Sequence, residues 1–177
     1  MTDAVAQLLP LFPAVPLIAA AFALLAPWRA VRDSIMLIIP GMGIFAGLGL
    51  LMYTMNNGVV AHTVGLYQGN VGIPFAADAF SALMIITTMI VAFGANWFAI
   101  AGGETKSRFY PSLTLILITG VCGALLTADL FNFFVFIEVM LLPSYGLITM
   151  SGTWSRLAAG RAFVLVLSLI HISDGAR

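Results

Sequence analysis

The sequence predicts an all-α integral membrane protein, a polytopic bundle of about six transmembrane helices. Hydrophobic residues make up 62% of the 177-residue chain and charged residues only 8%, and the apolar residues gather into runs of helix length. A soluble domain carries about 25% charged residues, whereas about 20 apolar residues span the hydrocarbon core of a bilayer. The formal net charge of +0 and the lack of a basic patch argue against a nucleic-acid partner.

Six apolar segments follow one another along the chain. They run over residues 8–26, 34–53, 78–101, 111–127 and 129–150, and the sixth begins near residue 157. Pro13 and Pro16 lie in the opening turns of the first segment, with Pro10 just before them, and are expected to kink or delay that helix. Pro111 is expected to start the fourth helix.

The basic residues predict the orientation of these helices. Six of the seven fall between segments one and two, three and four, or five and six: Arg29, Arg32, Lys106, Arg108, Arg156 and Arg161. The intervening turns, 56–77 and 128–129, contain no lysine or arginine. The positive-inside rule therefore predicts that the basic side is cytoplasmic and that the N-terminus lies outside. No cleaved signal is expected, because the N-terminus lacks a basic region and carries Asp3.

The long turn 56–77 leaves two interpretations open. Gln68-Gly69-Asn70 could turn a short β-hairpin over the bundle, or the segment could be an irregular loop. His62 lies in this turn and is expected to be solvated rather than part of a proton relay.

Small and polar residues within the apolar runs are interpreted as packing positions. Gly43 and Gly47 are spaced to let the second helix approach a neighbour closely. Cys122, the single cysteine, is expected to pack rather than to act in redox chemistry. Asn96 and Asn132 are expected to form hydrogen bonds between helices.

One buried carboxylate remains after the soluble catalytic motifs are excluded. The chain has no Walker loop, dinucleotide-binding glycine pattern, paired cysteines or His-Glu-x-x-His motif, and no cofactor or metal is expected. Glu138 lies about nine residues into the fifth segment, with no basic residue within helical reach. Such a residue usually faces a bundle interior or a watery cavity. Because burial favours a neutral carboxyl group, Glu138 is a candidate to hold and release a proton. The alternative is a structural glutamate that bonds a neighbouring helix.

Three residues around Glu138 extend this hypothesis. Pro143 cannot donate to the carbonyl of Val139, which would leave a polar group beside the glutamate; a simple packing kink is the alternative. Tyr145 lies two turns further on the same face and could donate a hydrogen bond. Asp129, like Asp78, is expected to cap a helix, and Asp129 could also mark the outer mouth of an ion path.

The fifth segment resembles a known family at this point. The stretch 127–147 (TADLFNFFVFIEVMLLPSYGL), together with Val71-Gly72-Ile73-Pro74-Phe75 and the run that begins at Asp78, is similar to the antiporter-like membrane subunits. These include the D-type subunit of the Mrp/Mnh multi-subunit cation/proton antiporter and the M-type and N-type subunits of respiratory complex I. The resemblance covers most of residues 1–166. The Asp-Leu-Phe-Asn run favours the Mrp D type, and Pro143-Ser144-Tyr145 looks closer to the complex I M type, so both parents stay open.

The resemblance implies that Glu138 is the family's intramembrane glutamate, a proton-path residue on the fifth helix. In the family it is coupled to a lysine on a seventh, broken helix, which this chain does not contain. The resemblance further implies H⁺ and Na⁺ as transported ions, other membrane subunits as partners, and a bacterial inner membrane as location.

The end of the chain departs from the family. Family members are about three times longer, and the stretch 167–173 (LSLIHIS) resembles a translated transposon-end adapter. We therefore expect residues 1–166 to be the N-terminal transmembrane helices of an antiporter-like subunit and 167–177 to be a non-native tail. His171 is for this reason not counted as a proton relay.

The sequence thus favours a transporter subunit rather than an enzyme, with no catalytic residue of its own. The preferred hypothesis is a subunit of a Na⁺/H⁺ antiporter with a proton path through Glu138. A proton-pumping subunit of NADH:quinone oxidoreductase or a membrane hydrogenase is the first alternative. A non-transporting membrane scaffold is the alternative from another class.

Overall fold

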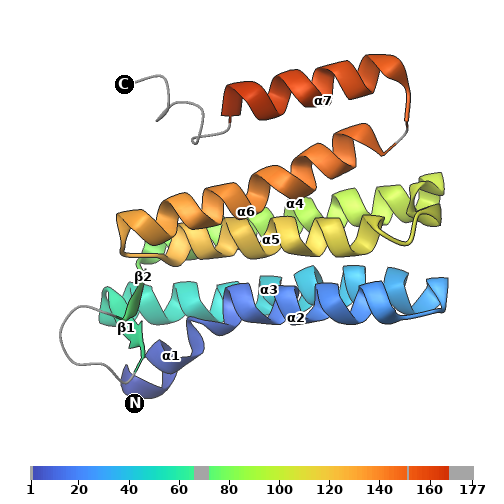
Figure 1. Ribbon diagram of the computed structural model, residues 1–177. Helices are drawn as coiled ribbons and strands as arrows, with labels where there is room; N and C mark the ends of the chain where they lie inside the picture. The colour runs from blue at the N-terminus through green and yellow to red at the C-terminus, as the bar shows by residue number, and fades with distance from the viewer. Residues whose placement is uncertain (1, 66–71, 151, 168–177) are drawn as a thin grey trace, which may run out of the picture.

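The computed structural model describes residues 2–65, 72–150 and 152–167. Within these ranges the chain is a bundle of helices that run up and down beside one another, with a β-hairpin at one end (Figure 1). The helices are α1 (Thr2–Leu8), α2 (Leu11–Leu25), α3 (Arg29–Asn57), α4 (Ala79–Gly102), α5 (Tyr110–Leu126), α6 (Leu130–Thr149) and α7 (Trp154–Leu167); a 3₁₀ turn, η1 (Glu104–Lys106), joins α4 to α5.

Four stretches of the described chain are long and apolar enough to cross a bilayer. They are Val5–Leu25, Arg29–Asn57, Ala79–Gly102 and Leu130–Thr149. α5 is a shorter apolar helix of 17 residues, and 14 residues of α7 are described. The all-α membrane fold predicted from the composition is therefore confirmed, and each of the six predicted segments corresponds to helix.

The first predicted segment is interrupted at Pro10, whereas the expected kink or delay was assigned to Pro13 and Pro16. α1 ends at Leu8 and α2 begins at Leu11, with Pro10 as its N-cap. Pro13 and Pro16 lie inside α2. Pro13 falls in the first turn, where a helix amide has no partner to lose, so the ring is accommodated without a break.

The turn 56–77 contains the hairpin, which decides between the two interpretations left open by the sequence. β1 (Val60–Val64) pairs antiparallel with β2 (Ile73–Ala77), in a register that sets Val60 opposite Ala77. Gln68-Gly69-Asn70 lies outside the described residues. β2 is tied to the turn before α6, since the amide of Ala128 donates to the carbonyl of Pro74 over 3.0 Å.

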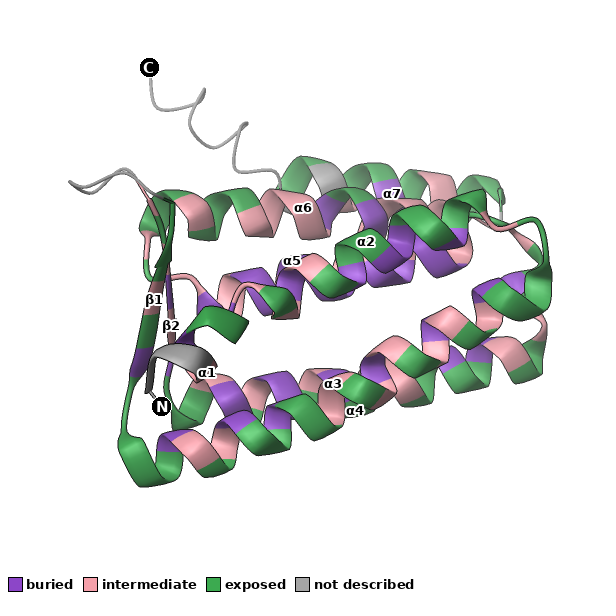
Figure 2. Ribbon diagram, turned by 90° about the horizontal axis from the view of Figure 1, so that it is seen from below, coloured by how far each residue is buried: buried purple, intermediate pink, exposed green. Residues whose placement is uncertain are grey.

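Glycines allow α3 and α4 to pack closely, as the spacing of Gly43 and Gly47 predicted. A Cβ on Gly43 would lie 2.6 Å from the sulfur of Met89, and one on Gly47 would lie 2.8 Å from Cγ1 of Ile86. Figure 2 shows that buried residues gather where α2, α5, α3 and α4 face one another, whereas α6 and α7 are mostly exposed or intermediate.

The two asparagines behave differently from each other. Asn96 is buried, and its amide donates across to the carbonyl of Met36 on α3 over 2.9 Å, which confirms the predicted bond between helices. Asn132 instead donates to Asp129 at the start of its own helix, over 2.9 Å. The interhelical bond expected for Asn132 is replaced by this local one, because Asn132 lies in the first turn beside the capping carboxylate. Cys122 is fully buried as a packing residue.

The basic residues meet at the end of the bundle opposite the hairpin (Figure 1). The Arg29 guanidinium donates to Thr105 over 2.9 Å and lies 3.4 Å from the Asp33 carboxylate. Arg108 reaches the carbonyl of Leu24 over 3.0 Å. The turn between α6 and α7, near Arg156, lies at this same end. The fold thus gathers on one end the charges from which the orientation was predicted.

Candidate functional site

α6 begins at Leu130 because the turn before it supplies a cap. The Asp129 carboxylate accepts a hydrogen bond from the backbone amide of Asn132 over 2.9 Å, which satisfies one of the free amides of the first turn. The capping role predicted for Asp129 is confirmed. Asp78 caps α4 in the same way, with the Ser81 amide 2.7 Å from its carboxylate. This amide holds the pKa of Asp78 below its usual value.

Glu138 lies in the middle of α6, nine residues beyond Asp129. At 1.5 Å per residue the two Cα atoms are about 13 Å apart along the axis, so their carboxylates do not form a pair. Glu138 is partly buried, between the exposed start of α6 and the buried Leu141. Glu138 thus lies near the middle of an apolar helix, as its place in the sequence indicates.

The contact between α5 and α6 determines which face Glu138 occupies. A Cβ on Gly123 of α5 would overlap the ring of Phe136, and one on Gly120 would lie 3.0 Å from the Phe136 carbonyl oxygen. Phe136 therefore points at α5. Glu138 follows two residues later, about 200° around the helix. The glutamate is thus turned away from α5.

Tyr145 lies on the Glu138 face of α6 and is turned toward α7. Seven residues correspond to nearly two full turns, so the two side chains share a face and are about 10 Å apart along the axis. The Tyr145 ring lies against Gly160 of α7, where an added Cβ would be 3.1 Å from Cε2. The hydrogen bond between Tyr145 and Glu138 stays a prediction.

Pro143 interrupts the hydrogen-bond ladder of α6 on the side that faces the bundle. It is buried inside the helix and has no amide to donate to the carbonyl of Val139. Two hydroxyl groups nearby bond back to their own helix, Ser144 to the Met140 carbonyl over 2.7 Å and Thr149 to the Tyr145 carbonyl over 2.8 Å. Such bonds often accompany a bend. The second half of α6 therefore places a carboxylate, Glu138, close to backbone carbonyls that do not follow the regular helical hydrogen-bond pattern.

The outer face of α6 is the least covered of the described spans. Only 6% of its apolar window is buried, against 22–33% for the other three. Leu130, Phe131 and Leu142 are 68%, 73% and 75% exposed. A helix with a carboxylate at mid-depth and apolar flanks of this kind is suited to further helices packing on it.

The described residues contain no group of three or more His, Cys, Asp or Glu side chains able to hold a metal ion. His62 lies on β1 opposite Phe75, at the hairpin end and away from mid-depth. Asp129, Glu138 and Tyr145 are distributed along one helix rather than gathered in one pocket.

The sequence reasoning did not identify Gly120 and Gly123 as positions that orient the site. The two glycines form a Gly-x-x-Gly pair inside the fourth apolar segment. Like the Gly43 and Gly47 pair, this spacing allows a neighbouring helix to approach closely. The spacing indicates a close contact but not the partner helix, and only the fold identifies that partner as α6.

Comparison with known proteins finds relatives of this chain among the D-type subunits of Na(+)/H(+) antiporters. No family model matches the chain. It is 36% identical over 162 residues to the D-type Na(+)/H(+) antiporter subunit of Alkalihalophilus pseudofirmus, covering 86% of this chain and 31% of the relative. It is 36% identical over 120 residues to the D-type subunit of Bacillus subtilis, covering 66% of this chain and 24% of the relative. The chain thus spans about a third or less of the length of these curated relatives.

Two solved structures share the fold. A chain of the Mrp complex from Dietzia sp. DQ12-45-1b superposes with a TM-score of 0.86 at 42% identity, over 91% of this chain and 31% of that one. A chain of the membrane-bound sulfane sulfur reductase, an archaeal respiratory membrane complex, superposes with a TM-score of 0.78 at 22% identity, over 91% of this chain and 33% of that one. The second likeness concerns the fold alone.

Proposed function

This chain belongs with the antiporter-like membrane subunits, as a homologue of about a third of a D-type Mrp subunit, and we propose that it contributes a proton path to a multi-subunit Na⁺/H⁺ antiporter. The observation that carries the proposal is the position of Glu138 in α6. It lies at mid-depth in a spanning helix, on the face turned away from α5.

Glu138 acts in this proposal as the intramembrane proton acceptor. A carboxyl group at this depth is expensive to keep charged, so it alternates between protonated and ionised forms only where water or polar groups reach it. Tyr145, on the same face, and the Val139 carbonyl, which Pro143 cannot engage, are the polar groups that this proposal assigns to the path. Asp129 would mark the hairpin-side mouth while it caps α6.

The remaining parts of the machinery are proposed to lie in other helices and subunits. The covered length is 31% of the first relative, and α6 presents an uncovered face. We propose that helices of the same subunit, and then other membrane subunits of the complex, pack there. Transport of H⁺ against Na⁺ would then belong to the assembly, with no cofactor or redox chemistry in this chain.

We propose a membrane orientation on the basis of the gathered charges. Arg29, Lys106 and Arg108 lie at one end of the bundle and the hairpin lies at the other. By the positive-inside rule, the basic end faces the cytoplasm and the N-terminus and hairpin lie outside. We propose the cell membrane of a bacterium as the location, since the antiporter subunits that the chain resembles come from bacteria.

Two other functions remain to be distinguished. One is a proton-pumping subunit of an NADH:quinone oxidoreductase or a related membrane hydrogenase; the sulfane sulfur reductase, a respiratory membrane complex, shares only its fold with this chain. A scaffold subunit would need Glu138 only as a helix-bonding residue. The higher identity to the Mrp complex, 42% against 22%, favours the antiporter.

The test is Glu138→Gln within the complete complex in everted membrane vesicles, with Glu104→Gln as the matched control. Both changes replace one carboxylate by an amide, and Glu104 is exposed in the turn between α4 and α5. We expect Glu138→Gln to abolish the Na⁺-dependent collapse of the pH gradient while the complex still assembles on a native gel. Unchanged transport in Glu138→Gln would refute the proton path and favour the scaffold. Proton movement that needs no Na⁺ would favour the respiratory type.

A further inference from the structure

α3 contains a proline in its interior. Pro40 is almost fully buried, and it has no amide to donate to the carbonyl of Met36, four residues earlier. Its ring also crowds that carbonyl and tilts it away from the helix axis. Interior prolines are for these reasons the usual sites of a kink or break. α3 nevertheless continues through Pro40 as one helix from Arg29 to Asn57.

The donor that Pro40 lacks is supplied by α4. The side-chain amide of Asn96 donates to the Met36 carbonyl over 2.9 Å, and both residues are buried, Asn96 to 2% exposure and Met36 completely. A backbone carbonyl left unpaired in such apolar surroundings is costly, and neighbouring helices in membrane proteins satisfy the groups that a proline frees. Asn96 thus takes the place that the amide of residue 40 would hold in a helix without proline.

We propose that Asn96 latches a proline hinge in α3. Pro40 divides the helix into a basic-side segment, residues 29–39, and a hairpin-side segment, residues 41–57. The bond from Asn96 to Met36 lies at the joint and fixes the basic-side segment on α4. While the bond is made, the two segments form one rigid helix. When it is broken, the basic-side segment swings about Pro40.

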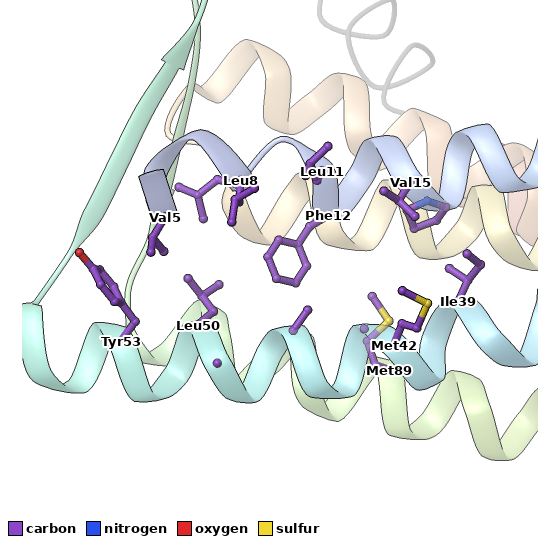
Figure 3. Close-up of a pocket in the computed structure, with 15 residues that line it drawn as sticks. Val5, Leu8, Leu11, Phe12, Val15, Ile39, Met42, Leu50, Tyr53 and Met89 are labelled. Atoms are coloured by element: carbon purple, nitrogen blue, oxygen red, sulfur yellow. The ribbon is translucent and has the colours of Figure 1, made fainter. Parts of the chain in front are cut away.

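The hairpin-side segment needs no latch because glycines hold it on α4. Gly43 and Gly47 pack directly against Met89 and Ile86 of that helix. Toward α2, in contrast, Met42 lines an apolar cavity close to the proline (Figure 3). At the level of Pro40, α4 is therefore the neighbour that holds α3.

The basic-side segment has weaker polar contacts at its other end. Arg29 donates to Thr105 over 2.9 Å, and the Thr105 hydroxyl donates to Asp33 over 3.4 Å. The Arg29 side chain is 45% exposed, so water competes for these contacts. The bond from Asn96 is fully buried and is thus the polar contact that determines where this segment lies.

The first experiment is a double-mutant cycle on the full chain, unfolded by sodium dodecyl sulfate in mixed micelles. Asn96→Leu removes the donor and keeps a side chain of similar size, and Pro40→Ala restores an amide at residue 40. We expect Asn96→Leu to raise the unfolding equilibrium constant about fivefold when Pro40 is present. In the Pro40→Ala background the increase should be less than about twofold, because the helix then satisfies the Met36 carbonyl itself.

Asn56→Leu is the matched control for this cycle. The Asn56 side chain is exposed and donates to the Met52 carbonyl of its own helix, so its effect should be small and equal in both backgrounds. Equal effects of Asn96→Leu in the two backgrounds would overturn the latch. If Asn96→Leu does not fold, Pro40→Ala should restore folding, and failure to fold in both backgrounds would also overturn it.

A second measurement observes the bond in the folded protein without any change at Pro40. Carbonyl-¹³C methionine with ¹⁵N leucine selects two carbonyls by nuclear magnetic resonance, since Met36-Leu37 and Met140-Leu141 are the Met-Leu pairs of the sequence. The Met140 carbonyl accepts from Ser144 and serves as the reference. Asn96→Leu should move the Met36 carbonyl resonance upfield, as loss of a hydrogen bond does, and leave that of Met140 in place. An unmoved Met36 resonance would overturn the proposal.

Hydrogen exchange separates a hinge from general loosening. In Asn96→Leu, amide exchange should become faster in residues 29–39 and stay unchanged in residues 41–57, because only the basic-side segment loses its hold. Faster exchange along the whole of α3, or no change in either segment, would show that Pro40 is not a hinge that Asn96 latches.

Discussion

Gly120→Ala should weaken the contact between α5 and α6 that orients Glu138. The added Cβ would overlap the Met140 side chain and would lie 3.0 Å from the Phe136 carbonyl oxygen and 3.2 Å from the Met140 amide nitrogen. A side chain can rotate away from such an overlap, but the two backbone atoms cannot, so the helices must move apart. Overpacking of this kind costs about 1–3 kcal/mol.

The magnitude is isolated by comparison with Gly94→Ala. Alanine is favoured over glycine in a helix by about 1 kcal/mol, and this gain applies to both variants. Gly94 has no atom within 4 Å of its added Cβ, so its variant shows the gain alone. The free energy of unfolding of Gly120→Ala should therefore fall about 1–3 kcal/mol below that of Gly94→Ala.

The assay is equilibrium unfolding of the chain by sodium dodecyl sulfate in mixed micelles, followed by far-ultraviolet circular dichroism. Gly123→Ala provides an intermediate case, because its overlap is with the Phe136 side chain rather than with backbone atoms, and a side chain can move to another rotamer. Equal stability of Gly120→Ala and Gly94→Ala would show that α5 and α6 do not approach each other this closely.

The other predictions concern a hydrogen bond and a helix cap. Asn96→Ala should lower the free energy of unfolding by about 1 kcal/mol through loss of the bond to the Met36 carbonyl, while Asn56→Ala, at an exposed position, should change it little in the same titration. Because the Ser81 amide holds the pKa of Asp78 below 3.8, its capping contribution is present above about pH 4 and is lost as the pH falls through the lowered pKa. Asp78→Asn should remove that part of the acid dependence of the unfolding temperature; an acid limb identical to the wild type would contradict it.

Much of the fold could be predicted from the sequence because the bilayer imposes strong rules. A spanning helix needs a long apolar run, and basic residues must lie at the helix ends, outside the hydrocarbon core. The start of α4 at Ala79, directly after its cap Asp78, followed from these rules together with cap chemistry. The meeting of Arg29 and Arg108 at one end of the bundle follows from the same rules.

The features that could not be predicted depend on neighbours distant in sequence. The spacing of Pro10, Pro13 and Pro16 does not determine which proline interrupts the helix, and the structure has the interruption at Pro10. The hairpin itself is held partly by a bond from Ala128 to Pro74, which joins segments far apart in the chain. The local sequence pattern was compatible with a hairpin and with an irregular loop in residues 56–77, and it could not distinguish between them.

In the candidate site, too, one property of Glu138 could be predicted from the sequence and another could not. The depth of Glu138 could be predicted because depth depends only on the position along a helix. Its direction could not, because direction is determined where Gly120 and Gly123 of α5 meet Phe136 and Met140. Gly120 and Gly123 have no side chain that could transfer a proton. Their close contact with α6 nevertheless determines that the carboxylate points away from α5. If the proton path runs through Glu138, a change at Gly120 that rotates or displaces α6 should impair transport even where Glu138 is intact. Transport that persists in a Gly120→Ala complex with a demonstrably displaced α6 would show that the direction of this carboxylate does not matter.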